Sequence, residues 1–281
     1  MAAFSKNMNN PDPRGLPKAL VLDMDGTFFL GESLLPGALE LLDFLNEREL
    51  PFSFLTNNTS RNKADYFGKL TKLGVRQADA RIFTAGDATI GFLKREHPGE
   101  RVFVMGTGSL IESFRRAGIR IDEQNPDLLV LGYDTELTYE KLVKFCLHLR
   151  AGLPFIATHP DFNCPSPLGP LPDIGAMMAM IEVSTGRKPD LVLGKPNAGI
   201  ILELARGWKL QPEEILMTGD RLYTDIALGS NAGVRTALVL SGESRLEDLE
   251  NSPFKPDLVF ENLLGLLDWL KNKNPVLKLS R

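Results

Sequence analysis

Residues 18–27 form the stretch KALVLDMDGT, an apolar run that ends in two aspartates and a glycine. The run has no polar face, as expected of a strand buried in a parallel sheet. Similar apolar runs recur along the chain with segments of helical period between them, at 51–56, 101–106, 127–132, 154–159, 190–195, 214–220, 235–240 and 257–261. This alternation predicts an α/β fold, a doubly wound parallel sheet covered by helices.

The number of strands also predicts the domain organisation. Nine strands exceed the usual sheet of about five or six, which favours two sheets and two domains. Turn residues near 85–87 and 184–190 mark the borders of an insertion. We therefore expect residues 85–186 to form a second α/β domain inserted between residues 1–84 and 187–281. Residues 1–17 have no apolar signal core and are expected to form a flexible tail.

Composition excludes several classes of protein. The chain has 281 residues, of which 43% are hydrophobic and 24% charged, and its formal charge is -4. This balance is typical of a soluble globular protein and gives no general attraction to nucleic acid or anionic lipid. No apolar run approaches the roughly 20 residues that a membrane span requires. Two cysteines, Cys146 and Cys164, are too few for a disulfide scaffold and fit a reducing cytoplasm.

Polar side chains follow four of the predicted strands. In open α/β sheets, ligands bind beyond the carboxyl ends of the strands, so these residues are candidate site residues. They are Asp23 and Asp25 in VLDMDGT, Thr56, Asn57 and Asn58 in FLTNNTS, Lys195 in VLGKPN, and Asp220 and Asp225 in TGDRLYTDI.

Most of these strand ends also have a plain structural interpretation. Asp-Gly is a common turn pair, which would leave the first two carboxylates solvated. The polar residues of TNNTS could cap a helix that begins near Ser60, and Asp225 could be an acid that interacts with a helix dipole. Lys195 is harder to explain in this way, because a buried ammonium costs several kcal/mol unless it is paired. We expect its partner to be a carboxylate or a phosphate.

Together the four ends predict a phosphoryl-transfer site on one edge of one sheet. Clustered carboxylates repel one another unless a hard cation lies among them. An oxygen-rich site with a lysine and a hydroxyl-amide loop is what Mg²⁺ and a phosphoryl group would require. The carboxylate nearest the metal could then attack phosphorus, and its neighbour could protonate the leaving alcohol.

The ordered set DMDGT, LTNN, GKPN and GDRLYTDI resembles the four motifs of the haloacid dehalogenase (HAD) superfamily of phosphatases. The TNN form of the second motif, GKP in the third and the insertion between them resemble the NagD-like, class IIA branch, which carries an α/β cap of the C2 type. The similarity continues through the insertion, in VLGYDTELTYEKL, FIATHPDFNCPS and DIGAMMAMIEVSTGRKPD. Bacterial proteins of this pattern are described as p-nitrophenyl phosphatases or sugar-phosphatase-like hydrolases.

The resemblance implies a Rossmann-like core, a C2-type cap and a Mg²⁺-dependent hydrolase of small phosphomonoesters. Asp23 would be the nucleophile that forms an aspartyl-phosphate, and Asp25 the general acid and later the base. Mg²⁺ would be held by the Asp23 carboxylate, the backbone carbonyl of Asp25 and Asp220. Asp225 would order the metal's waters or the Lys195 ammonium.

The same resemblance implies which residues bind the phosphoryl group and the rest of the substrate. Thr56 would donate its hydroxyl and Asn57 its backbone N–H to phosphoryl oxygens, with Asn58 beside them, and Lys195 would neutralise charge. The cap would contact the leaving group, and Asp161 and Asn163 in the segment THPDFNCPS are its candidate residues.

Two further expectations concern the cap. By alignment Cys164 replaces a histidine of related pyridoxal phosphatases, which argues against specialisation for pyridoxal phosphate. His159 in the same segment is more often a surface or capping residue than a catalytic one. Caps of this type pair in relatives, so the resemblance also allows a homodimer.

Two other functions remain open at this point. A phosphotransferase or mutase would use the same aspartyl-phosphate but pass the phosphoryl group to another alcohol. A non-enzymatic phosphoacceptor switch also combines acids, a hydroxyl residue and a lysine on such a sheet. Its acceptor lies on a middle strand apart from the acid pair, however, and no cap is inserted.

Overall fold

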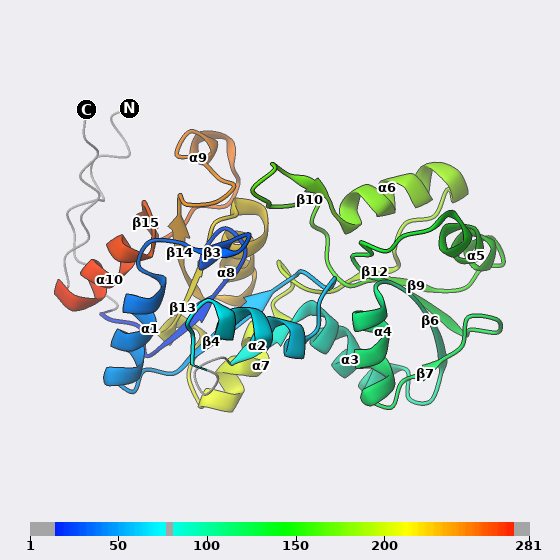
Figure 1. The fold of residues 1–281 in the computed structure, drawn as a ribbon, viewed down its shortest axis with the longest axis horizontal. Helices are drawn as coiled ribbons and strands as arrows, with labels where there is room; N and C mark the ends of the chain where they lie inside the picture. Colours follow the sequence, from blue (N-terminus) through cyan, green and yellow to red (C-terminus); the bar gives the residue numbers. More distant parts are fainter. Residues whose placement is uncertain (1–14, 77–80, 273–281) are drawn as a thin grey trace. The chain divides into compact units, whose positions relative to one another are not determined.

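The computed structural model describes residues 15–76 and 81–272, so the predicted tail of residues 1–17 lies outside the described residues except for 15–17. The predicted α/β class is confirmed by two sheets of mainly parallel strands with helices beside them (Figure 1). By their contacts the described residues divide into two compact units. One comprises the residues up to Leu55, Lys69–Arg81 and the residues from Ala198 on, and the other comprises Thr56–Gly68 and Ile82–Asn197.

The larger sheet has six strands. They are β1 (Ala19–Leu22), β4 (Phe52–Thr56), β5 (Ile82–Thr84), β13 (Ile215–Gly219), β14 (Arg235–Val239) and β15 (Leu258–Phe260). Their order is β15-β14-β13-β1-β4-β5, and every pairing from β4 to β15 is parallel. In the register, Leu20 of β1 lies opposite Leu216 of β13 and Phe52 of β4, and β1 is buried along its whole length.

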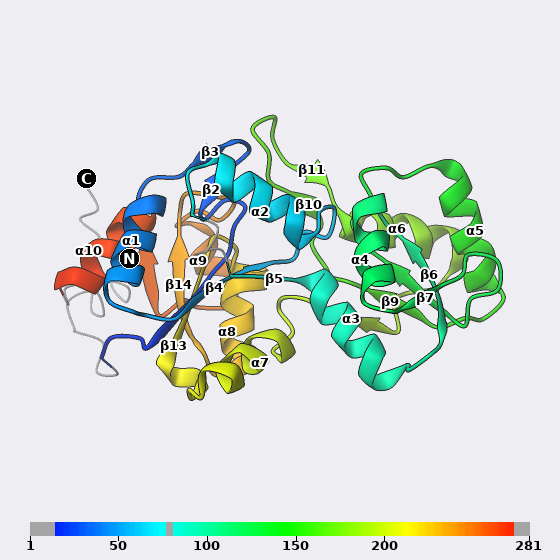
Figure 2. The same cartoon turned by 60° about the horizontal axis from the view of Figure 1, so that its bottom comes forward.

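Helices of the first unit cover both faces of this sheet (Figure 2). On one face α1 (Ala38–Glu47) packs against α10 (Leu263–Asn272), and on the other α7 (Gly199–Trp208) packs against α8 (Ala227–Ala232). The remaining elements are the hairpin of β2 (Phe29–Leu30) and β3 (Ser33–Leu34), a 3₁₀ turn at Pro212–Glu214, a π-helical turn at Leu222–Ile226, and α9 (Asp248–Asn251).

A five-stranded parallel sheet forms the centre of the second unit. Its order is β12-β9-β8-β6-β7, with β6 (Arg101–Met105), β7 (Arg120–Ile121), β8 (Leu128–Leu131), β9 (Phe155–Ala157) and β12 (Leu191–Val192). Val102 and Val104 of β6 join one hydrophobic cluster, whereas Phe103 and Met105 join another. Because alternate residues of a strand face opposite sides, two buried faces explain why the run is apolar throughout.

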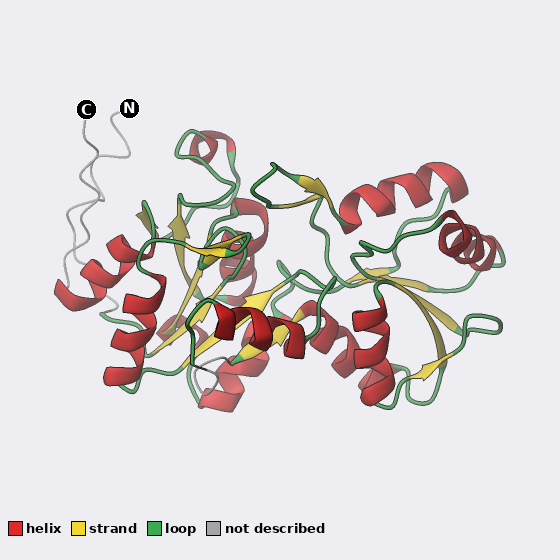
Figure 3. Ribbon diagram, in the orientation of Figure 1, coloured by secondary structure: helices red, strands yellow, loops and turns green. Residues whose placement is uncertain are grey.

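Two pairs of helices flank this five-stranded sheet, one pair on each face (Figure 3). α3 (Ala85–Glu96) and α4 (Gly108–Arg116) cover one face, and α5 (Tyr139–Arg150) and α6 (Ile174–Thr185) cover the other. The hairpin of β10 (Asn163–Cys164) and β11 (Leu171–Pro172) precedes α6, and α2 (Lys63–Lys72) spans the border between the units. Among the described residues, no helix is both long and apolar enough to cross a membrane.

One expectation about the sheets is wrong. The strand before Lys195 is only Leu191–Val192, and it pairs with β9 in the five-stranded sheet. The four polar strand ends therefore do not share one sheet. An apolar run indicates where a strand lies and where it ends, but the choice of its neighbour depends on long-range packing.

Candidate functional site

Three buried carboxylates come together in the first unit. Asp23 follows β1, Asp220 follows β13, and Asp225 lies in the π-helical turn after it. Asp23 is 6% exposed and the other two are fully buried, and all three offer carboxylate oxygens within 4.8 Å of one another. Because β1 and β13 are adjacent and parallel, their carboxyl ends bring Asp23 and Asp220 to the same edge. The buried position of Asp225 differs from that of a solvated acid near a helix end.

Asp25 is half-buried and lies outside this carboxylate group. Its backbone forms an isolated parallel bridge with Phe29, and the N–H of Gly26 donates to the Phe29 carbonyl at 2.9 Å. A turn with a fixed backbone fits the family expectation that Asp25 would reach a metal through its carbonyl oxygen rather than its side chain.

Three glycines make room for the carboxylates. A Cβ atom at Gly26, where φ is +89°, would lie 2.4 Å from Oδ2 of Asp220, and one at Gly242 would lie 1.9 Å from the same oxygen. A Cβ atom at Gly219 would lie 2.2 Å from Cγ of Asp225. Real side chains never approach this closely, so only glycine permits the backbone to pass beside the acids.

Backbone donors orient two of the acids. The N–H of Glu243 donates to Oδ2 of Asp220 at 2.7 Å, and the N–H of Arg221 donates to Oδ2 of Asp225 at 3.1 Å. The Thr27 hydroxyl lies 3.5 Å from Oδ1 of Asp220.

The loop after β14, residues 241–244, is a part of the site that sequence reasoning missed. The Ser241 hydroxyl donates to the Gly26 carbonyl at 2.9 Å, and the N–H of Ser244 donates to the Asp220 carbonyl at 3.1 Å. The sequence does indicate this loop, because the polar residues SGES directly follow the apolar run 235–240. The rule that ligands bind beyond the carboxyl ends of strands would have predicted residues 241–244 as part of the site.

This donor set fits a hard divalent cation. Its three side chains are all carboxylates, and carboxylates buried so close together repel one another unless positive charge lies among them. Oxygen ligands are what such cations prefer, and the glycines keep the space beside the acids free of side chains. Asp23, Asp220 and Asp225 could therefore hold a metal ion.

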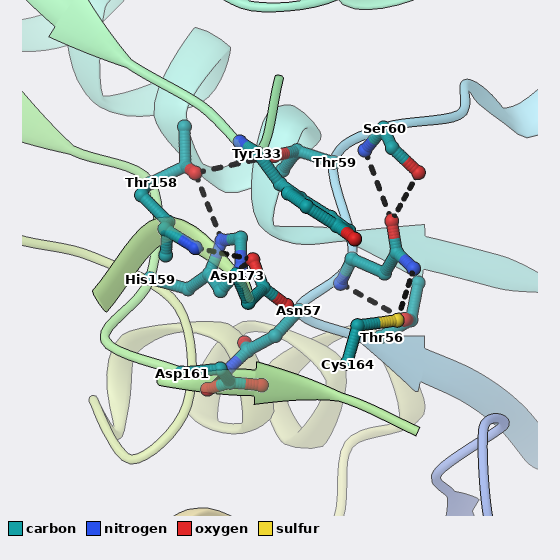
Figure 4. A network of polar contacts seen from close by, with 12 residues as sticks. Thr56, Asn57, Thr59, Ser60, Tyr133, Thr158, His159, Asp161, Cys164 and Asp173 are labelled. Atoms are coloured by element: carbon teal, nitrogen blue, oxygen red, sulfur yellow. Dashed lines mark hydrogen bonds and ion pairs between the residues drawn. The ribbon is translucent and has the colours of Figure 1, made fainter. Parts of the chain in front are cut away.

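In the second unit, the loop after β4 is organised by its own side chains. The Thr56 hydroxyl accepts the N–H of Asn58 at 3.1 Å. Oδ1 of Asn58 accepts the N–H and the hydroxyl of Ser60 at 3.0 and 2.6 Å (Figure 4). These bonds form a tight turn and leave Thr56 and Asn57 only 2% and 3% exposed.

The alternative that these residues cap a helix is wrong. The next helix, α2, begins at Lys63 rather than near Ser60. Its first turn is capped by Asn62 and Asp65, each of which accepts the backbone N–H of the other at 3.0 and 2.9 Å. The residues of the TNN motif are therefore not needed as caps.

The side chain of Asn57 forms two hydrogen bonds with the backbone of Lys195. The N–H of Lys195 donates to Oδ1 of Asn57 at 2.8 Å, and Nδ2 of Asn57 donates to the Lys195 carbonyl at 3.0 Å. Nδ2 also donates to Oδ1 of Asp161 at 2.8 Å (Figure 4). Lys195 is 3% exposed, so its predicted burial is confirmed.

The segment THPDFNCPS has a buried part and an exposed part. Asp161 is 3% exposed, whereas Asn163, at the start of β10, is exposed. His159 is fully buried, so the expectation of a surface or capping histidine is wrong. Its Nε2 lies 3.1 Å from Oδ1 of Asp173 and its Nδ1 lies 2.9 Å from the Thr158 hydroxyl (Figure 4).

Asp173 was not among the residues predicted for the site. It precedes α6, and its Oδ1 accepts the N–H of Ile174 at 2.6 Å. An aspartate before an apolar helix suggests a cap, but nothing local indicates that it also pairs with a histidine 14 positions earlier.

Comparison with known proteins identifies the family. A model of haloacid dehalogenase-like hydrolases matches residues 20–120, and a HAD-hydrolase-like model matches residues 192–266. An acid sugar phosphatase of Staphylococcus aureus is 34% identical over 247 residues, which cover 88% of this chain and 95% of that protein. The chain belongs to the haloacid dehalogenase-like hydrolases.

Solved structures define the branch of this HAD hydrolase. A 4-nitrophenylphosphatase from Thermotoga maritima is 49% identical, with 88% of this chain and 95% of that chain covered and a TM-score of 0.83. NagD from E. coli K-12 is 34% identical, with 89% and 98% covered and a TM-score of 0.79. The predicted resemblance to the NagD-like branch is confirmed, and this HAD hydrolase is a phosphatase.

Proposed function

We propose that this phosphatase is a Mg²⁺-dependent phosphomonoester hydrolase that acts through an aspartyl-phosphate on Asp23. The observation that carries the proposal is the group of buried carboxylates of Asp23, Asp220 and Asp225. An anionic phosphoryl group can approach these acids only when a cation offsets their charge. Oxygen ligands alone favour Mg²⁺ over softer metals.

Two aspartates perform the chemical steps. A carboxylate oxygen of Asp23 attacks phosphorus while the bond to the ester oxygen breaks, and Asp25 gives its proton to that leaving oxygen. Asp25 then takes a proton from the water that attacks the phosphoryl group and releases Asp23. Asp23, Asp220, Asp225 and the Asp25 carbonyl would hold Mg²⁺, which when bound neutralises charge on the phosphoryl oxygens.

The TNN loop and Lys195 are assigned to phosphoryl binding. The Thr56 hydroxyl and the Asn57 backbone N–H donate to phosphoryl oxygens, Asn58 supports the same loop, and Lys195 neutralises charge. Support comes from the family motifs and from the burial of Thr56, Asn57 and Lys195, because donors and charges removed from water interact more strongly with an anion.

We assign small phosphorylated metabolites as substrates, with sugar phosphates as the first class to examine. The names of the acid sugar phosphatase and the 4-nitrophenylphosphatase support this choice. The predicted insertion, residues 85–186, acts as the cap that selects the leaving group. Within it, Asn163 is exposed, whereas Oδ1 of Asp161 already accepts from Asn57. Asn163 is therefore the stronger candidate for direct contact with substrate.

The test is a phosphate-release screen of the purified protein over small phosphomonoesters, with and without Mg²⁺. We expect release that requires Mg²⁺ and disappears in Asp23→Asn, because an amide cannot form the acyl phosphate. Asp268→Asn, an exposed acid of α10, makes the same chemical change away from the site and should retain activity. Metal-independent release, or an active Asp23→Asn variant, would overturn the proposal.

We also propose that the protein forms a homodimer through α5 and α6. On α5, Tyr139, Val143 and Leu147 recur every four residues and are 80%, 37% and 62% exposed. The adjacent α6 exposes Met180 and Val183 at 40% and 90%. Apolar side chains clustered in this way are typical of interfaces.

Light scattering coupled to size-exclusion chromatography tests this assembly. We expect a dimer for the natural chain and a monomer for the double variant Leu147→Glu, Val183→Glu, because it buries two charges in the interface. A natural chain that remains monomeric at concentrations of about 100 μM would refute the dimer.

A further inference from the structure

The side chain of Asn57 is hydrogen-bonded at every polar position. Oδ1 accepts the Lys195 N–H, and the two hydrogens of Nδ2 go to the Lys195 carbonyl and to Oδ1 of Asp161. An asparagine amide has two donors to give, so the donor capacity of this one is fully used inside the protein. The side chain of Asn57 thus has no spare donor for a phosphoryl group, whatever its backbone does.

Its neighbours also determine which way the amide points. With the amide reversed, Oδ1 would face two acceptors, the Lys195 carbonyl and the Asp161 carboxylate, and Nδ2 would face the Lys195 N–H. Every bond would then be replaced by a repulsion between like groups. The buried carboxylate of Asp161 contributes most, because a hydrogen bond to a charged acceptor is roughly twice as strong as a neutral one.

The amide holds Lys195 at two points. Its contact with both the N–H and the carbonyl of Lys195 resembles the pairing of one strand with another and fixes the backbone that carries the lysine side chain. The preceding residue, Gly194, permits this approach. At its φ of +66° a Cβ atom would lie 2.8 Å from Oδ1 of Asn57 and 2.7 Å from the Thr158 carbonyl oxygen.

Asp161 is itself held in place by the segment around it (Figure 4). Its carbonyl accepts the N–H of Gly175 at 2.8 Å. The residues just before it are fixed because His159 contacts Asp173 and Thr158, and the Thr158 hydroxyl lies 3.3 Å from that of Thr59. The acceptor that orients Asn57 therefore belongs to a buried, hydrogen-bonded network.

We propose that the Asn57 side chain is a positioning group, oriented by Asp161, that holds the backbone of Lys195 so that its ammonium meets the phosphoryl group. The inference deepens the proposed function and rests on it, since the role of Lys195 belongs to that proposal. It assigns Asp161 to the support of Lys195 rather than to direct contact with substrate.

An exchange of the two residues tests the pairing. Asn57→Asp should lower kcat about thirtyfold or more with KM changed less than about threefold, because it loses both donors and places two carboxylates together. The double variant Asn57→Asp, Asp161→Asn restores a donor–acceptor pair, since the amide introduced at position 161 can donate to the new carboxylate at position 57, which still accepts the Lys195 N–H. We expect it to recover at least about tenfold in kcat over the single variant.

Hydrogen exchange of the Lys195 amide gives a readout that does not depend on catalysis. Asn57→Asp should speed this exchange, and the double variant should slow it again. Asp161→Asn alone keeps an acceptor and the same shape, so it should fold and show a smaller change in the same direction. Asn125→Asp makes the same substitution at an exposed site and should leave both activity and exchange unchanged.

The outcomes separate this inference from the proposed function. If the natural chain shows no phosphatase activity, but substitutions at residues 57 and 161 still change the exchange rate of the Lys195 amide, the proposed function is refuted and the positioning role of Asn57 is not. Unchanged Lys195 exchange in both Asn57→Asp and Asp161→Asn would overturn the positioning role. A double variant no more active than Asn57→Asp would do the same.

Discussion

The two units each contain a buried group of three titratable residues, and the groups are built differently. In the first unit the members are Asp23, Asp220 and Asp225, and in the second they are His159, Asp161 and Asp173. Both bring their ligand atoms within 4.8 Å of one another. The first consists of carboxylates alone, whereas the second contains an imidazole.

The residues around the two groups also differ. In the first group, glycines pass beside the acids and backbone N–H groups contact Asp220 and Asp225. In the second, an asparagine amide donates to Asp161, and His159 lies between Asp173 and a threonine hydroxyl. Buried acids need compensation in either case. Similar residue types can therefore form either a place for a cation or a structural network, depending on which groups the chain puts beside them.

The largest expected effect concerns Asp25, whose side chain is not part of the first group. Asp25→Asn should lower kcat about a thousandfold, because the variant lacks the proposed general acid and base. Its affinity for Mg²⁺ should change less than about threefold, since the Asp25 side chain lies outside the three-carboxylate group. Calorimetric titration and steady-state kinetics measure the two quantities. A large loss of Mg²⁺ affinity would place the Asp25 side chain among the ligands.

A smaller effect distinguishes the two groups by their need for a cation. Asp220→Asn should weaken Mg²⁺ binding by roughly a hundredfold, or about 2.7 kcal/mol, because one charged ligand is removed. Asp161→Asn, the same change in the second group, should leave Mg²⁺ affinity within about threefold. Titration of both variants in one buffer tests the contrast. Equal losses in the two variants would contradict the distinction drawn between the groups.

The third prediction concerns how much the contact between His159 and Asp173 in the second group contributes to stability. His159→Leu should lower the free energy of unfolding by about 2 kcal/mol, because the buried side chain of Asp173 loses its histidine partner and keeps only the N–H of Ile174. His97→Leu breaks a similar pair with Glu100 that is partly exposed, and should cost less than about 1 kcal/mol.

Urea unfolding of both histidine variants measures the difference. Adding Asp173→Asn to His159→Leu should recover part of the loss, since an amide oxygen can still accept the Ile174 N–H and is less costly to bury than a carboxylate. Equal destabilisation by the two histidine variants would show that burial of the pair in the second group has no special consequence.

Much of the fold was predictable from apolar runs. Each of the nine runs contains a strand, because a strand buried on both faces has a long apolar signal. The short strands β2, β3, β5, β7, β10 and β11 were not predicted, since two or three residues carry no periodicity. Sheet membership was predicted less well, and the strand before Lys195 was assigned to the wrong sheet.

At the candidate site, the order of residues along the chain was enough to show which residue types follow the strands, and the four motifs identified the family. Three contacts became visible only in the folded chain: Asp23, Asp220 and Asp225 form one group, His159 is buried against Asp173, and the Asn57 amide joins Asp161 to Lys195. These contacts join residues that are far apart along the chain. Asn57 lies 104 positions from Asp161 and 138 from Lys195. Local periodicity carries no information about such contacts, which form only when distant segments of the second unit come together in the folded chain.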